Sequence, residues 1–74
     1  MRKSEFRRAV DTVFGEGYGR VVLRDLVLTE FGDRTAEQAL AEGAPPREVW
    51  TALCDAEGVP LARRHGVGLP APRD

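Results

Sequence analysis

The sequence predicts an all-α fold: a small orthogonal bundle of three principal helices plus one short helix, followed by a flexible C-terminal tail. Apolar residues recur at helical spacing in the first and the last predicted helix, and glycines and prolines stand where helices begin or end. Because the chain has only 74 residues, it forms one domain at most. We expect this domain over residues 1–60 and a flexible basic tail over residues 61–74.

The first predicted helix begins near the N-terminus. Ser4 suits its N-cap, and Glu5 lies in the first turn, where the helix dipole favours a carboxylate. An amphipathic stripe follows at i, i+3, i+4, i+7 and i+8: Phe6, Ala9, Val10, Val13 and Phe14. Gly15 ends this helix, and residues 15–19, with three glycines, are predicted to form a turn within which the next helix begins.

The densest run of large aliphatic side chains lies in residues 21–31. Such a run can be a buried strand or a helix. We favour a helix, because the alternation typical of a strand fails twice and no second strand-like run is available to pair with it. This central helix is predicted to continue to Phe31 and to stop at Gly32.

Asp25 is the most informative polar residue of the central run. On a helical wheel it lies in the middle of the face that contains Tyr18 and Val22. A buried carboxylate needs a hydrogen-bond partner. We therefore expect it to accept from Arg34, from the indole N–H of Trp50 or from the N-terminal amides of another helix. The alternative is an exposed binding point for a partner.

Two further helices are predicted downstream. Thr35 and Gln38 fit a capping box, so a short helix should extend from Ala36 to about Glu42 and end at Gly43. Pro46 suits the first position of the last helix, which Gly58 ends. The apolar face of that helix consists of Val49, Trp50, Leu53 and Cys54, with Trp50 as the main anchor.

Charge is unevenly distributed. Residues 1–20 carry a net charge of +2, residues 21–57 a net charge of −5 and residues 58–74 a net charge of +2. The net negative charge of residues 21–57 is unfavourable for a protein that binds nucleic acid through its core. The basic ends contain a candidate patch, which is either a solvated helix face or a phosphate-binding surface: Arg7, Arg8, Arg20, Arg63 and Arg64.

A helix-turn-helix is the sharpest alternative to a plain helical corner. With Gly43 as the turn glycine, the spacing of apolar positions in that motif is matched by Ala39, Ala44, Val49 and Ala52. However, Gln38 and Glu42 stand where apolar residues belong. The helix that would read DNA is also acidic, with Arg47 against Glu48, Asp55 and Glu57, and phosphates repel an acidic helix.

Several classes of function have no support in the sequence. There is no signal peptide and no apolar run of the roughly 18 residues that span a membrane, so we expect a cytoplasmic protein without a membrane partner. The single cysteine, Cys54, cannot form an internal disulfide, and the single histidine, His65, lies in the predicted tail. No nucleophile, base and orienting group converge, so we expect no enzyme activity, metal or cofactor.

The motifs GDRTAEQALAEGAPPREVWTALCDAEGVP, SEF and FG-x-x-Y resemble a small bacterial family, domain of unknown function 3046. The likeness covers roughly residues 1–60, and its most specific parts are Arg34-Thr35, Ala39-Leu40, Gly43 and the helix with Trp50. The resemblance implies a compact helical protein. With the residues above, it favours a non-enzymatic interaction or regulatory module that docks on a protein partner by a helical face, with Asp25, Arg34, Thr35 and Trp50 as structural or partner-contacting residues. The alternative is a nucleic-acid-associated accessory factor, and the oligomeric state stays open.

Overall fold

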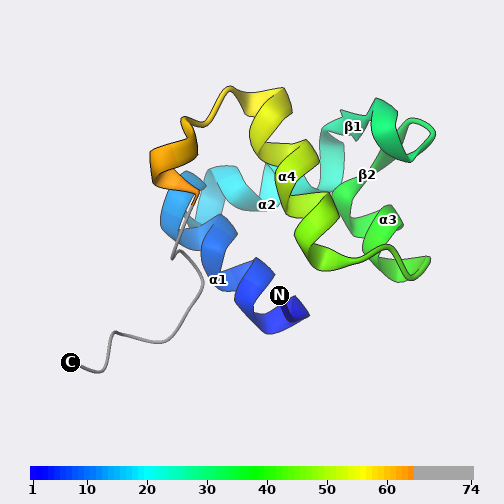
Figure 1. Ribbon diagram of the computed structural model, residues 1–74, viewed down its shortest axis with the longest axis horizontal. Coiled ribbons are helices and arrows are strands. Elements are labelled where there is room, and N and C mark those ends of the chain that lie inside the picture. The colour runs from blue at the N-terminus through cyan, green and yellow to red at the C-terminus, as the bar shows by residue number, and fades with distance from the viewer. Residues whose placement is uncertain (65–74) are drawn as a thin grey trace.

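The computed structural model describes residues 1–64, and this part of the chain is a helical bundle with one small sheet (Figure 1). The elements in chain order are α1 (Lys3–Phe14), α2 (Glu16–Asp25), β1 (Val27–Leu28), the 3-10 helix η1 (Thr29–Phe31), β2 (Arg34–Thr35), α3 (Ala36–Ala41), α4 (Pro46–Glu57) and the 3-10 helix η2 (Leu61–Arg63). The predicted all-α class is confirmed, with three principal helices and one short one. The predicted tail lies outside the described residues from His65 onward, and its first residues form η2.

The sheet and α3 lie at one end of the molecule and η2 at the other, with α4 between them (Figure 1). Helix α1 packs against both α2 and α4, and α3 packs against α2 and α4. A single apolar core results, built mainly from one face of each helix together with β1. Its members are Phe6, Ala9, Val10, Val22, Leu23, Leu28, Ala36, Ala39, Val49, Trp50, Ala52, Leu53, Cys54 and Val59.

Helix α1 begins slightly earlier than its sequence predicts. Its N-cap is Arg2, whose backbone N–H donates to the Glu5 carboxylate at 2.6 Å. The prediction that Ser4 is the cap is therefore wrong, because Glu5 reaches back around the first turn and places Ser4 inside the helix. The predicted apolar stripe is correct, since Phe6 is fully buried and Phe14 packs on the core.

Helix α2 begins at Glu16, within the predicted turn over residues 15–19 as expected, and so early that a single residue, Gly15, separates it from α1. The reason lies at Gly19, which is buried in α2. A Cβ atom at this position would lie 2.7 Å from Cγ1 of Val10. Gly19 thus allows close contact between the two helices, and the packing gained there offsets the cost of glycines inside a helix.

The prediction of one central helix as far as Phe31 is wrong. Helix α2 ends at Asp25, and the chain then forms β1, which pairs antiparallel with β2 through Val27↔Thr35 and Leu28↔Arg34. Between the strands the chain reverses through η1 and two residues in the left-handed region, Gly32 (φ 68°) and Asp33 (φ 61°). The Asp33 N–H donates to the Leu28 carbonyl at 3.0 Å, which closes the hairpin.

The end of α3 is set by a glycine in the left-handed region, as predicted. Gly43 has φ 98°, and its N–H donates to the Leu40 carbonyl at 3.1 Å. The next N–H, of Ala44, donates to the Ala39 carbonyl at 3.0 Å. These two bonds make a Schellman motif, which satisfies the last carbonyls of α3 and turns the chain toward α4.

The tryptophan of α4 lies at the centre of the core, where it is 4% exposed. Its ring meets Phe6 edge-on, with centroids 6.1 Å apart, and Phe14 in the same way at 6.3 Å. The indole N–H of Trp50 has no hydrogen-bond acceptor among the described residues. Trp50 therefore stabilises the fold through apolar contact and not through a hydrogen bond.

Candidate functional site

The α3–α4 corner has the form of a helix-turn-helix. Its turn glycine, Gly43, has a positive φ, and three of the apolar positions that define the motif are buried: Ala39, Val49 and Ala52. Ala44 is half-buried and packs on the same core. The spacing seen in the sequence therefore corresponds to side chains that point inward, as that motif requires.

The two polar residues that depart from the motif both make local contacts. The Gln38 N–H donates to the Thr35 hydroxyl at 3.2 Å, and the Thr35 N–H donates to the Gln38 side-chain carbonyl at 2.9 Å. This capping box is the one that the sequence predicts. Glu42 forms an ion pair with Arg34 at 2.7 Å. Both departures thus stabilise the start and the end of α3.

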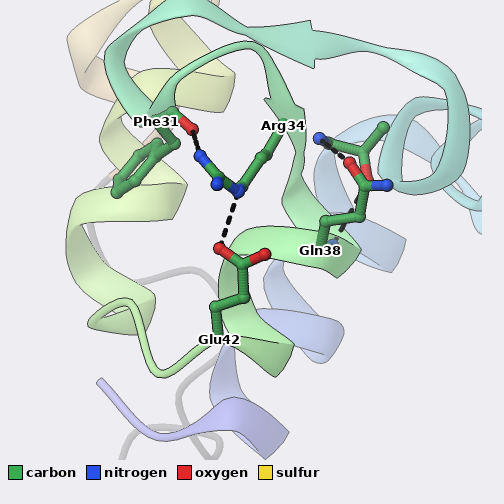
Figure 2. Close-up of polar contacts among 5 residues, drawn as sticks. Phe31, Arg34, Gln38 and Glu42 are labelled. Atoms are coloured by element: carbon green, nitrogen blue, oxygen red, sulfur yellow. Dashed lines mark hydrogen bonds and ion pairs between the residues drawn. The ribbon is translucent and has the colours of Figure 1, made fainter.

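Arg34 links the hairpin to the end of α3 (Figure 2). Besides its ion pair with Glu42, the guanidinium donates to the Phe31 backbone carbonyl at 3.1 Å. Both charged side chains stay about half exposed, so water screens this pair and its contribution to stability is small. Its effect is to fix the position of Phe31 relative to α3.

Asp25 does not lie in the core, which contradicts its predicted burial. Its side chain is 60% exposed, and its nearest charged partner is the neighbouring Arg24, at 3.4 Å. The wheel assumed a helix that continues past residue 25, whereas α2 ends there and turns Val22 and Leu23 inward. Neither Arg34 nor the Trp50 indole contacts the Asp25 carboxylate.

A groove of about 460 Å³ runs between η1 and α4. We call it the η1–α4 groove. Its apolar lining is the half-buried Phe31 and the buried Ala52, and exposed Thr51 lies beside them. Its charged lining is Glu30, Glu48 and Asp55 against Arg47. This groove was not predicted from the sequence, although positions 48, 51, 52 and 55 recur at helical spacing and so share one face of α4.

One carboxylate of the groove, that of Asp55, is held in place by Arg64. The Arg64 guanidinium donates to the Asp55 carboxylate at 2.7 Å and to the Val59 carbonyl at 2.7 Å. The Arg64 side chain is only 14% exposed, whereas that of Asp55 is 56% exposed. Only one Asp55 oxygen contacts Arg64, so the carboxylate is positioned and its second oxygen can still accept a hydrogen bond.

The predicted basic patch is dispersed over the structure. Arg64 pairs with Asp55 and is largely covered, and Arg63 reaches the Val13 carbonyl at the end of α1, at 3.5 Å. Arg7 lies on the first half of α1, in a shallow groove that α3 also lines. Since Arg7 and Val13 are six positions apart, about 9 Å of helix separates them. Arg8 and Arg20 are exposed on α1 and α2, and Arg64 is withdrawn from any phosphate-binding surface.

The two groups with perturbed acidity are structural. Cys54 is fully buried, and burial raises the pKa of its thiol to about 11, although the positive charge of Arg64 acts in the opposite direction. Such a thiol is protonated at neutral pH and is a poor nucleophile. The Tyr18 hydroxyl donates to the Glu57 carboxylate at 2.8 Å, and this bond raises the pKa of the phenol. The contact joins the start of α2 to the end of α4.

Residues 1–64 contain no group of three or more histidine, cysteine, aspartate or glutamate side chains that could hold a metal ion. Over the same residues, no helix is long and apolar enough to cross a membrane.

Fold and site together define a small all-α domain with a helix-turn-helix-like corner. The second helix of this corner, α4, has an acidic exposed face. The chain belongs to the family described as "Protein of unknown function (DUF3046)", whose pattern matches residues 1–62. Neither the curated proteins nor the solved structures gave a match to this chain.

Proposed function

We propose that this protein is a small non-enzymatic module of the cytoplasm that docks on a protein partner through the outward face of α4, beside η1. The observation that supports this proposal is the η1–α4 groove, where apolar and charged side chains lie next to each other. Protein-binding sites combine an apolar centre with a polar rim in this way. The hairpin that carries η1 is closed by the Asp33 N–H to Leu28 carbonyl bond and by the Arg34 contact with the Phe31 carbonyl, and these bonds favour one shape of the groove.

The groove includes half-buried Phe31, held from the other side by the contact between its carbonyl and Arg34 (Figure 2). That bond holds the backbone, and the Phe31 ring packs against the core; an aromatic side chain restricted in this way loses little conformational entropy when a partner covers it. Rigid aromatic residues are frequent energetic centres of protein interfaces for this reason.

A nucleic-acid-associated role is the second candidate, because the corner has the helix-turn-helix form. The motif reads DNA through the exposed first turns of its second helix. In α4 these turns present Arg47, Glu48 and Thr51, and Asp55 follows one turn later. Carboxylates in these positions repel phosphates, so the same exposed face favours protein over DNA.

Two threonines give a matched test of the docking face. Thr51 on α4 and Thr12 on α1 are both exposed, and both hydroxyls donate to the backbone carbonyl four residues earlier, at 3.1 Å and 2.9 Å. Thr51→Arg puts a long cationic side chain into the η1–α4 groove, whereas Thr12→Arg makes the same change on a different surface.

The experiment is affinity capture from lysate of the source cell, with and without nuclease treatment, using wild type, Thr51→Arg and Thr12→Arg. We expect a protein that wild type and Thr12→Arg retain in stoichiometric amount and that Thr51→Arg loses. Equal retention by all three proteins would contradict docking through this face. Loss of the captured material on nuclease treatment, together with a gel shift at low salt, would favour the nucleic-acid role.

A further inference from the structure

We propose that the occupant of the η1–α4 groove is a basic protein segment: a short stretch with lysine or arginine side chains on both sides of one apolar residue. This inference rests on the docking function proposed above and specifies the class of partner. It is carried by the charge and the shape of the groove lining together.

The charge of the lining is net negative, although one of its carboxylates is already paired. Three carboxylates, of Glu30, Glu48 and Asp55, face the groove against the one guanidinium of Arg47. Asp55 is already paired with Arg64, and the pair of Arg34 with Glu42 is balanced in the same way, so the excess negative charge comes from Glu30 and Glu48. A cationic segment is therefore attracted, whereas an acidic peptide or a nucleic acid is repelled.

The carboxylates of the groove differ in how strongly contacts within the protein fix their orientation before a partner binds. Asp55 is held by Arg64, whose guanidinium is itself anchored on the Val59 carbonyl. Glu30 lies 3.4 Å from the hydroxyl of Thr29, a weaker contact. Because Asp55 is already oriented, it loses little side-chain entropy when a partner cation binds to its open oxygen. We infer that Asp55 is the fixed point of the site and that Glu30 and Glu48 adapt to the partner.

The apolar part of the lining specifies the centre of the partner segment. Phe31 of η1 and Ala52 of α4 form the apolar part, and the exposed members of the lining are the charged residues and Thr51. A partner side chain that covers Phe31 removes apolar surface from water, worth about 25 cal/mol per Å² before the costs of association. A purely cationic segment would lack this contribution and would be released by salt more easily.

Arg47 is the one cationic residue of the groove lining, and a basic occupant must approach it. Its removal should strengthen the binding of a basic segment, whereas it would weaken the binding of an acidic one. This reversal of sign separates a charge-selective groove from a generally adhesive surface.

The test uses full-length ¹⁵N-labelled protein and three short acetylated peptides. One has a single leucine between two runs of lysines, one has glutamates in place of the lysines, and one has serine in place of the leucine. We expect the lysine–leucine peptide to shift the amide signals of Phe31, Thr51 and Ala52. The serine peptide should bind more weakly, and the glutamate peptide should leave these signals unchanged.

Variants complete the test. The double variant Glu30→Gln/Glu48→Gln should weaken binding of the lysine–leucine peptide about fivefold. Arg47→Gln should strengthen it by a smaller factor. The control Asp11→Asn/Glu16→Gln makes the same change in net charge on α1 and α2, where both carboxylates are exposed outside the groove, and should leave affinity unchanged.

Three results would overturn the inference. A glutamate peptide that shifts the groove amides as strongly would show that the charge class is wrong while docking through the groove survives. Peptide-induced shifts confined to other surfaces would place the basic ligand elsewhere. Groove signals that move on simple dilution would identify a second copy of this chain as the occupant. Failure of the docking proposal itself would appear separately, as equal capture by the Thr51→Arg and Thr12→Arg variants.

Discussion

The α1–α2 pair and the segment from β1 to the end of α3 are stabilised in different ways. The helix pair is held by close apolar contact, with Val10 and Phe14 of α1 against Gly19 of α2. The second segment has few buried side chains and relies on polar contacts over short chain distances, such as Thr35 with Gln38 and Arg34 with Glu42. Substitutions should therefore lower the free energy of unfolding strongly in the first region and weakly in the second. The following predictions test this difference.

The largest effect is expected at Trp50, where the aromatic contacts of α1 meet α4. Trp50→Ala removes a buried ring and should lower the free energy of unfolding by about 3–5 kcal/mol, which is comparable to the whole stability of so small a domain. Trp50→Phe should cost much less, because the indole N–H has no acceptor and its loss breaks no hydrogen bond. Urea unfolding followed by circular dichroism measures both variants. An equal loss in the two would mean that the indole N–H makes a contact essential to the fold.

The next effect tests the close contact of the helix pair. Gly19→Ala places a Cβ 2.7 Å from Val10 and should destabilise by about 1–3 kcal/mol through overpacking. Gly17 provides the control, because it lies in the same helix with nothing within 4 Å of its would-be Cβ. Gly17→Ala should therefore stabilise the protein by up to about 1 kcal/mol through helix propensity alone. Melting temperatures that shift in the same direction for both variants would contradict the close packing at Gly19.

The same difference explains which parts of the fold the sequence predicted. Helices α1 and α4 have apolar stripes at helical spacing and end at glycines, so local pattern was sufficient. The β1–β2 pair could not be predicted in this way, because Leu28 pairs with Arg34, and a strand of two residues has no period to detect. The reversal also depends on Asp33 at positive φ, which aspartate tolerates but does not require. The capping box of α3 was predictable, since both of its partners lie within three residues.

The candidate site was less predictable than the fold. The helix-turn-helix spacing and the acidity of the outward α4 face were visible in the sequence. The η1–α4 groove was not, because it depends on where the hairpin places Phe31 relative to Ala52. Arg64 was also misassigned to a basic patch, since its contact with Asp55 depends on how the chain turns after α4. Residues that come together across a turn not anticipated from the sequence are the ones that local pattern misses.

A smaller effect is expected within the polar region, at the cap of α3. Thr35→Ala removes the hydroxyl that accepts from the Gln38 N–H, and it should cost about 1 kcal/mol. Thr35→Ser keeps the hydroxyl and should recover most of that stability. Both variants can be compared by urea unfolding followed by tryptophan fluorescence, because Trp50 lies in α4, away from the substitution. A serine variant as unstable as the alanine variant would mean that the threonine methyl group, and not the cap, stabilises this end.

The smallest effect is expected at Asp25, where the two regions join. The carboxylate is 60% exposed and its contact with Arg24 is long, so the pair contributes little to stability. Asp25 is also the last residue of α2, where the helix dipole disfavours negative charge. Asp25→Asn should therefore leave the free energy of unfolding within about 0.5 kcal/mol of wild type, with any change toward higher stability. Urea unfolding of the two proteins side by side measures this difference. A loss above about 1 kcal/mol would show that the junction between the packed helices and the hairpin depends on the Asp25 charge.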